Sequence, residues 1–503
     1  MSSSKNPLLK SIEKKDSNFI LSGKNSALSY QNLFSVINRV TGQLRSLKVK
    51  KNEVAAIVTR NGPNAATTFL ATCSGVIAAP LNPEYTKAEF KFYIQDLQAK
   101  VLLVEAGDHY NARQAADELN IPVANIIESS LPGNISLYQN NSEICPIKAD
   151  FNQTDDNALI LHTSGTTSKP KIVPLTIGNL FESSNHIANT LQLNSKDRYF
   201  NIMPLFHIHG LVAGVLSTLN SGGGMICSKG FDGLNFFKLI EEFHPSWYSG
   251  VPTMHQIILN RAASNVKIIE KANFRFIRSS SASLPIKTLL NLEKTFGCPV
   301  IEAYGMTEAA HQMTSNLLPP MKRIPGSVGV AAGPEVAVVV KNNEIKKRNA
   351  TGEIVIRGDN VFKGYLNNSK ANSNSFLEGW FRTGDEGKLD SEGYLTITGR
   401  LKEIINRGGE KIMPKEVDEV ILKHPDVEQA VTFSVPHEKL GEEIGLALVI
   451  KENHVLSKKD VVEFCKDKLA KFKVPTKILF LKEIPKGSTG KLQRIGLAKK
   501  LGL

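Results

Sequence analysis

A loop of small hydroxyl residues, glycine and lysine spans residues 161–171 and has the composition of a phosphate-binding loop. It reads Leu-His-Thr-Ser-Gly-Thr-Thr-Ser-Lys-Pro-Lys and follows an apolar run, 158–161, that predicts a buried strand. Backbone N–H groups, hydroxyls and ammonium groups together can bind a polyphosphate. The loop is not a Walker A sequence, because Pro170 stands where that pattern requires Gly-Lys-Ser/Thr. A solvated loop or a linker has a similar composition, so this segment alone only suggests nucleotide binding.

Four further motifs follow this loop in a fixed order. They are Tyr304-Gly305-Met306-Thr307-Glu308, Thr383-Gly384-Asp385, Gly399-Arg400-Leu401-Lys402-Glu403 and Ser488-Thr489-Gly490-Lys491. With these five motifs, the chain from about residue 25 to its end resembles the adenylate-forming superfamily, which includes acyl-CoA synthetases, luciferases and peptide-synthetase adenylation domains. The resemblance implies a reaction in two steps. A carboxylate first attacks the α-phosphate of ATP and expels diphosphate, and a thiol then attacks the acyl carbon and expels AMP.

Both steps need groups that stabilise dispersed negative charge. The resemblance implies that Glu308 binds Mg²⁺, a hard cation that prefers oxygen ligands, and that Thr307 contacts the α-phosphate. Lys491 would be the main catalytic residue, because it would bridge the substrate carboxylate and the α-phosphate. The other implied ATP-binding residues are Thr163, Ser164, Gly165, Thr166, Thr167 and Lys171 at the β- and γ-phosphates, Glu302, Ala303 and Tyr304 on the adenine side, Asp385 at the ribose, and Arg400 at the ribose or phosphates.

The resemblance also implies a second substrate, coenzyme A, and a moving C-terminal domain. Lys402 matches the hinge about which the family rotates this domain between the two steps. Gly408 and Gly409 match a loop that turns toward the pantetheine chain of CoA, where glycine permits close approach. Ser168 and Ile172 depart from the common phosphate loop, in which glycine is usual at both positions.

The segments that would form the acid-binding pocket are unusually polar for a fatty-acid tunnel. We expect His207, Ser281 and His311 to converge on a second carboxylate of the substrate, because a buried carboxylate needs such donors. These segments resemble the oxalate–CoA ligase branch of the superfamily, although Gly305 stands where that branch has alanine. We therefore expect an acid–CoA ligase that acts on oxalate.

Three alternatives remain open. The first is a ligase for a longer acid, such as 4-coumarate, a medium-chain fatty acid or another short diacid. The second is an adenylating enzyme that loads a carrier protein, which the lack of an attached carrier domain disfavours. The third is a non-catalytic nucleotide- or RNA-binding protein that uses the net charge of +13. Glu308, Asp385 and Lys491 argue against the third alternative, so we expect no nucleic-acid partner.

The elements that position these motifs are typical of an α/β fold. Short apolar strands such as 54–58 and 101–104 alternate with helices such as 64–76, which predicts mostly parallel sheets in layers. We expect an AMP-binding domain over 1–398, with loosely ordered residues 1–25 and a β-barrel-like subdomain over 326–398. A hinge at 399–403 would join it to a small, mobile α+β lid domain over 404–503.

Composition is that of an ordinary globular protein, with 41% hydrophobic and 22% charged residues. There is no apolar run long enough for a transmembrane helix, no secretory signal, and no Ser-Lys-Leu at the C-terminus. The five cysteines are scattered, which is typical of a reducing compartment. We therefore expect a cytoplasmic protein that does not insert into membranes. The sequence does not indicate an oligomeric state.

Overall fold

The computed structural model describes residues 6–13, 15, 17–22, 26–163, 170–466, 468–485 and 492–503. This part of the chain divides into two compact units. The first holds the described residues of Met1–Thr163 with Lys171–Glu335 and Arg357–Asn374, and the second holds those of Val336–Ile356 and Ser375–Leu503. None of the described helices combines the length and apolar character that a membrane span requires. The α/β class expected from the sequence is confirmed.

One sheet of the first unit carries the strand that precedes the phosphate loop. Its strand order is β10-β9-β4-β3-β5-β6-β7-β8, and the strands from β9 to β6 pair in parallel. Strand β3 is buried at every residue, as expected for a parallel strand covered on both faces. The strands are β3 (Val54–Val58), β4 (Ile77–Pro80), β5 (Val101–Glu105), β6 (Val123–Glu128), β7 (Ile135–Gln139), β8 (Ser142–Glu143), β9 (Asn157–Thr163) and β10 (Lys171–Thr176).

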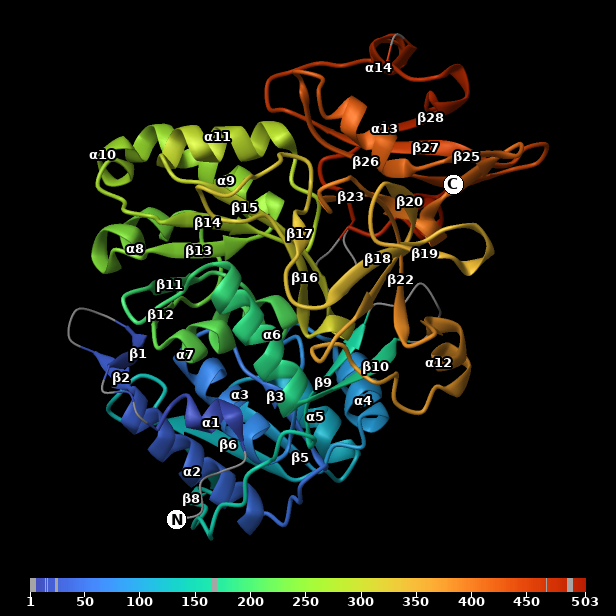
Figure 1. Ribbon diagram of the computed structural model, residues 1–503. Coiled ribbons are helices and arrows are strands. Elements are labelled where there is room, and N and C mark those ends of the chain that lie inside the picture. Colours follow the sequence, from blue (N-terminus) through green and yellow to red (C-terminus); the bar gives the residue numbers. More distant parts are fainter. Residues whose placement is uncertain are drawn as a thin grey trace. The chain divides into compact units, whose positions relative to one another are not determined.

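The other sheet of the first unit carries the start of the Tyr304–Glu308 motif, at the end of strand β15. Its order is β17-β16-β15-β14-β13-β11-β12-β1-β2, with parallel pairing from β15 to β1. Helices α8 (Phe236–Phe243), α9 (Pro252–Ala262) and α11 (Ile286–Phe296) pack on it around Phe237, Ile258 and Leu292 (Figure 1). The strands are β1 (Asn18–Leu21), β2 (Ala27–Ser29), β11 (Arg198–Asn201), β12 (Gly224–Cys227), β13 (Trp247–Gly250), β14 (Phe276–Ser279), β15 (Val300–Met306), β16 (His311–Ser315) and β17 (Val330–Ala331).

Helices of the first unit connect these strands. A π-helix, η1 (His209–Leu216), begins two residues after His207 of the predicted acid pocket, and such helices are frequent at functional sites. The α-helices are α1 (Pro7–Lys10), α2 (Tyr30–Ser46), α3 (Pro63–Gly75), α4 (Lys87–Asp96), α5 (Tyr110–Glu118), α6 (Ile177–Thr190), α7 (Ser217–Ser221), α8 (Phe236–Phe243), α9 (Pro252–Ala262), α10 (Val266–Ile269), α11 (Ile286–Phe296) and α12 (Ser369–Ser375), and the 3₁₀ turns are η2 (Ala263–Asn265) and η3 (Thr307–Ala309).

The loose N-terminal segment expected over residues 1–25 is wrong for its described residues. Asn6 caps α1 by accepting hydrogen bonds from two backbone N–H groups, and Pro7 occupies the first helical position, where a missing N–H costs nothing. Leu8 and Leu9 are buried, and β1 pairs in parallel with β12. Burial of these apolar side chains outweighs the polar composition from which disorder was expected.

The second unit contains two smaller sheets. The first has the order β19-β18-β20-β22-β21, with β23 also paired to β22, and the second has the order β25-β24-β27-β26, with β28 paired to β27. The strands are β18 (Glu335–Val339), β19 (Ile345–Lys346), β20 (Ala350–Arg357), β21 (Phe376–Leu377), β22 (Trp380–Leu389), β23 (Leu395–Arg400), β24 (Ile405–Arg407), β25 (Glu410–Ile412), β26 (Val427–His437), β27 (Gly441–Ile450) and β28 (Lys477–Phe480).

The helices of the second unit cover its C-terminal sheet. Val417 and Ile421 of α13 and Val461 and Cys465 of α14 share one core with the strands β24 to β28. The helices are α13 (Pro414–Ile421), α14 (Lys458–Lys466) and α15 (Leu497–Lys500), and the 3₁₀ turns are η4 (Lys341–Asn343), η5 (Leu401–Glu403) and η6 (Lys471–Lys473). The strands over 336–356 thus group with C-terminal residues, while the domain division at 399–403 stays a prediction.

Candidate active site

Thr163 and Lys171 border the predicted phosphate loop and lie side by side. Strands β9 and β10 pair antiparallel, with Thr163 directly opposite Lys171, and the Thr163 hydroxyl lies 3.5 Å from the Lys171 carbonyl oxygen. Both are half-buried. The predicted residues between them, Ser164, Gly165, Thr166 and Thr167, lie outside the described residues.

Glu308, the predicted metal ligand, is linked to Lys171 through Tyr365. The buried Glu308 Oε1 accepts a hydrogen bond of 2.9 Å from the Tyr365 hydroxyl. The Lys171 ammonium lies 4.2 Å from the centroid of the Tyr365 ring. Burial and the neighbouring Glu308 charge raise the pKa of Tyr365, so its hydroxyl stays protonated and donates. Sequence analysis did not select Tyr365.

The environment of Glu308 fits a magnesium ion. Carboxylate oxygens are ligands that Mg²⁺ prefers, and the ion usually keeps water and phosphate oxygens in its other positions. The Phe362 N–H donates to the Glu308 carbonyl at 2.8 Å, and the Tyr365 hydroxyl fixes the carboxylate. One oriented carboxylate is thus available to a metal–nucleotide complex.

The predicted adenine-side residues lie on β15. Glu302 is buried, and its Oε1 accepts a hydrogen bond of 2.9 Å from the Leu284 N–H, which fixes the segment after β14. The Ala303 carbonyl accepts one of 2.9 Å from the Ser280 hydroxyl. Tyr304 and Thr307 keep part of their surface exposed. The structure therefore gives Glu302 a positioning contact and leaves the last two accessible.

In the second unit, Asp385 and Arg400 form an ion pair across two strands. They are register partners in β22 and β23, and Arg400 Nε donates to Asp385 Oδ1 at 2.7 Å. Asp385 is buried, and its N–H donates to the Thr383 hydroxyl at 3.1 Å. A carboxylate held in this way is an oriented acceptor for vicinal hydroxyls such as those of a ribose.

The predicted hinge and CoA-binding residues also lie in the second unit. Lys402 is exposed in the 3₁₀ turn η5, directly after β23. Gly408 and Gly409 form the turn between β24 and β25 with φ of 58° and 95°, values that favour glycine. Lys491, the predicted catalytic residue, lies outside the described residues.

The predicted acid pocket contains a histidine that sequence analysis did not select. His209 Nδ1 lies 3.0 Å from the Ser281 hydroxyl, and the His209 ring stacks on His311 with centroids 4.9 Å apart. The structure thus brings Ser281 and His311 together around His209. The ring of His207 packs beside Phe206 at 4.4 Å, and its contact with substrate stays a prediction.

Backbone strain is concentrated at this cluster. Ser281 and His311 have φ of 70° and 100°, which are unfavourable for residues with a Cβ and are typical of functional sites. Gly305 pairs closely with this segment, since a Cβ added there would lie 1.8 Å from the His311 carbonyl oxygen. The alanine expected at this position in the oxalate–CoA ligase branch would therefore require a shift of the backbone.

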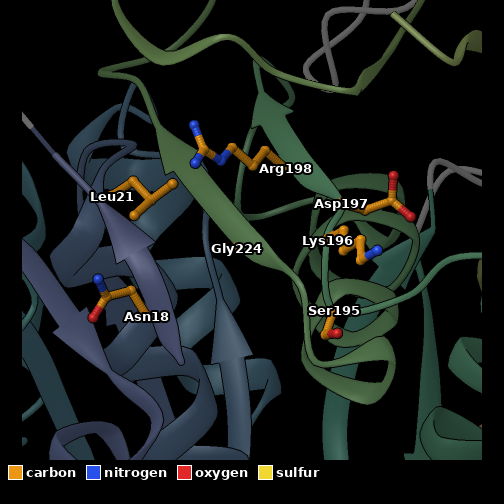
Figure 2. Close-up of a pocket in the computed structure, with 7 residues that line it drawn as sticks. All are labelled: Asn18, Leu21, Ser195, Lys196, Asp197, Arg198 and Gly224. Carbon is orange, nitrogen blue, oxygen red and sulfur yellow. The ribbon is translucent and has the colours of Figure 1, made fainter. Parts of the chain in front are cut away.

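A hollow of about 390 Å³ lies elsewhere in the first unit (Figure 2). It is lined by residues of β1, β11 and the loop before β11, among them Asn18 and Arg198. Its buried carboxylate, Asp197, already accepts hydrogen bonds from Arg275 and Ser246 at 2.8 and 2.7 Å. It contains none of the predicted site residues.

Comparisons with known proteins agree with these observations. Residues 10–366 match the family described as AMP-binding enzyme, and residues 416–491 match its C-terminal domain. The oxalate–CoA ligase of Arabidopsis thaliana is 44% identical over 93% of this chain and 92% of its own length. That of Saccharomyces cerevisiae is 42% identical, covering 90% and 87%. The crystal structure of ATP-bound MatB from Rhodopseudomonas palustris has a TM-score of 0.88 at 27% identity, covering 99% of both chains.

Proposed function

The chain belongs to the AMP-binding enzyme family, and we propose that it is an ATP-dependent acid–CoA ligase whose acid is oxalate. An oxalate oxygen forms a bond to the α-phosphorus of ATP, and the bond to diphosphate breaks. The CoA sulfur then bonds to the acyl carbon and loses its proton to solvent, and the carbon–oxygen bond to AMP breaks. The products are oxalyl-CoA, AMP and diphosphate.

The phosphates would be bound by the phosphate loop, Lys171, Thr307, Glu308 and Lys491. Lys171 and the phosphate loop carry the cations and donors for the β- and γ-phosphates, and Thr307 is accessible for the α-phosphate. Glu308, oriented by Tyr365, would hold Mg²⁺, which supplies positive charge at the phosphates when bound. Lys491 would bridge the carboxylate and the α-phosphate, so its loss should reduce adenylation more than thioester formation.

Side chains of the second unit would bind the ribose and CoA. Asp385, fixed by Arg400, presents a carboxylate for the ribose hydroxyls. Gly408 and Gly409 present a turn without side chains for the pantetheine chain, and Lys402 would be the hinge within 399–403. We also propose a cytoplasmic location, on the basis of five scattered cysteines.

The observation that carries the choice of oxalate is the polar cluster of the buried His209 and His311 with the half-exposed Ser281. A fatty acid or 4-coumarate needs an apolar pocket, because burying unpaired polar groups beside a hydrocarbon is costly. A short diacid needs hydrogen-bond donors in the same place. Two relatives above 40% identity are named oxalate–CoA ligases, which supports the same acid.

Diphosphate release across a carboxylate panel tests this function. The purified chain is given ATP, Mg²⁺ and CoA with oxalate, malonate, acetate, octanoate or 4-coumarate. We expect oxalate to give the highest kcat/KM. A preference for octanoate or 4-coumarate would retain the adenylation chemistry but reject the polar pocket. Release with none of the acids, together with salt-sensitive RNA binding, would favour a non-catalytic protein.

A further inference from the structure

Arg278, on β14, is fully buried. The hydrogen bonds that its side chain makes go to a histidine, a serine and a glutamine, and none of these is a carboxylate. Its Nη1 lies 3.4 Å from both His209 Nε2 and the Ser249 hydroxyl, and its Nη2 donates to Gln312 Oε1 at 3.3 Å. Within the described residues, its Nε has no hydrogen-bond partner and no carboxylate lies within ion-pair distance. No sequence motif had indicated a role for Arg278.

The described part of the chain thus supplies no counter-charge to the Arg278 guanidinium. Burial lowers the pKa of Arg278 to about 10, so the guanidinium is still protonated at neutral pH. Three hydrogen bonds at 3.3–3.4 Å are long, and a buried ion normally requires an opposite charge to offset its lost hydration. The chain therefore keeps a buried cation that only an anion from outside the described residues would neutralise.

The hydrogen bonds around Arg278 lead toward the accessible edge of the cluster. Arginine only donates, so Nη1 donates to the Ser249 hydroxyl, which lies 2.6 Å from His209 Nε2 and can donate to it. His209 Nδ1 then carries the proton and donates to Ser281 Oγ. The Ser281 hydroxyl, which is half-exposed, is left with its own hydrogen to donate to a ligand oxygen.

We propose that Arg278 selects dianionic acids, acting through His209 and Ser281 on the carboxylate that does not react. This inference rests on the proposed function, since it concerns the same acid pocket. The positive charge favours a second carboxylate over a neutral group of the same shape, because charges interact strongly in a buried site. Arg278 is thus a positioning residue that determines specificity.

The test compares oxalate with oxamate, its monoamide, which has nearly the same shape but lacks the second negative charge. We expect Arg278→Gln to lower kcat/KM for oxalate by about 100-fold, as for loss of one partner of a buried charge pair. The value for oxamate should change by less than about 5-fold, so the oxalate/oxamate ratio collapses. Arg278→Lys should recover part of this ratio.

Arg275→Gln is the matched control. Arg275 is three residues away and pairs with Asp197 at 2.8 Å, so its loss should leave the oxalate/oxamate ratio unchanged. An unchanged ratio in Arg278→Gln would overturn the inference. If Arg278→Gln fails to fold, the oxalate/oxamate ratio is measured in Arg278→Lys and in Ser281→Ala instead. The inference is overturned if both of these variants keep the ratio of the wild type.

The wild-type enzyme separates this inference from the proposed function. A wild type that adenylates no dicarboxylate contradicts the substrate assignment and the inference together. If the wild type adenylates oxalate and the Arg278 variants still prefer oxalate over oxamate, the proposed function stands and only the inference about Arg278 is contradicted.

Discussion

One arginine in each unit makes hydrogen bonds inside the protein, and the surroundings of the two differ: Arg278 is fully buried, and the side chain of Arg494 is 26% exposed. In the second unit, Arg494 donates to Glu403 Oε2 at 3.0 Å and to Asp418 Oδ2 at 2.5 Å. In the first unit, Arg278 reaches only a histidine, a serine and a glutamine among the described residues. Arg494 therefore has carboxylate counter-charges in its own chain, whereas Arg278 has none among the residues that the structure describes.

The two pKa values follow this difference. For Arg494, burial lowers the pKa, but Asp418 and Glu403 raise it above its ordinary value. For Arg278, burial dominates and lowers the pKa to about 10. A charge that is neutralised within the chain contributes to the fold. A buried charge that lacks a counter-charge indicates a place where a ligand of opposite sign binds.

The largest effect on stability is expected for Arg494→Met. It leaves the buried Asp418 without its charged partner, a loss that costs about 3–5 kcal/mol in a fully buried pair and less here, where Arg494 is 26% exposed. Amide hydrogen exchange in α13 and at Thr432, whose N–H donates to Asp418, should accelerate accordingly. Adding Asp418→Asn should restore much of the protection. No acceleration in the single variant would mean that internal pairing does not stabilise the second unit.

Tyr365→Phe should reduce adenylation by about 10- to 100-fold, because it removes a hydrogen bond to a charged group worth about 1.5–3 kcal/mol. Glu308 is oriented by that hydroxyl, so the apparent KM for Mg²⁺-ATP should rise. The matched control is Tyr138→Phe, which removes an exposed tyrosine–carboxylate contact at Glu143. The measurement is the rate of diphosphate release at varied Mg²⁺-ATP concentration. If both variants change this rate equally, the proposed role of Glu308 in nucleotide binding is contradicted.

The buried side chain of His255 is neutral at pH 7, whereas the buried side chain of Arg278 is charged. Burial lowers the pKa of His255 to about 3, against an ordinary 6.5, so the unfolded chain binds the proton first as pH falls. Stability is therefore complete above pH 6.5 and is lost on acidification toward pH 3, by about 2 kcal/mol at pH 5. Urea denaturation between pH 5 and 7 measures this loss. His255→Gln should flatten the dependence, and an unchanged slope would assign it to other groups.

The smallest effect is expected for the stability of Arg278→Gln. Arg278 has no carboxylate partner among the described residues, and its loss relieves a desolvation cost while removing three long hydrogen bonds. The free energy of unfolding should therefore change by less than about 1 kcal/mol. Urea denaturation beside Arg494→Met makes the comparison direct. A loss as large as that of Arg494→Met would show that Arg278 is part of the fold, and the contrast between the units would fail.

Strands with strong apolar patterns were predicted closely from the sequence. The run 54–58 is β3, 101–104 lies in β5, and 158–161 lies in β9. The helix expected over 64–76 is α3. These elements are set by local burial and periodicity, which a single sequence displays. The family motifs selected Glu308, Asp385 and Arg400 as candidate ATP-site residues, and these roles stay predictions.

Other residues of the candidate site could not be predicted, because their positions depend on contacts between segments that are distant in the sequence. His209 lies two residues after His207 and begins a π-helix. The backbone conformation of this helix places the ring of His209 against Ser281, and the sequence alone does not predict a π-helix here. Arg278 was hidden because arginine is rarely buried, so a strand pattern gives no reason to expect it. Tyr365 lies 57 residues from Glu308 in a loop without a recognisable motif, and only the folded chain joins them.

The most direct test of the proposed chemistry uses oxalate labelled with oxygen-18 in both carboxylates, with ATP, Mg²⁺ and CoA. Attack by a carboxylate oxygen on the α-phosphorus, followed by thiol attack on the acyl carbon, leaves that oxygen on AMP. We predict one labelled oxygen per AMP formed, and oxalyl-CoA in equal amount. Label in inorganic phosphate, or oxalyl-CoA formed with unlabelled AMP, would contradict the acyl-adenylate route.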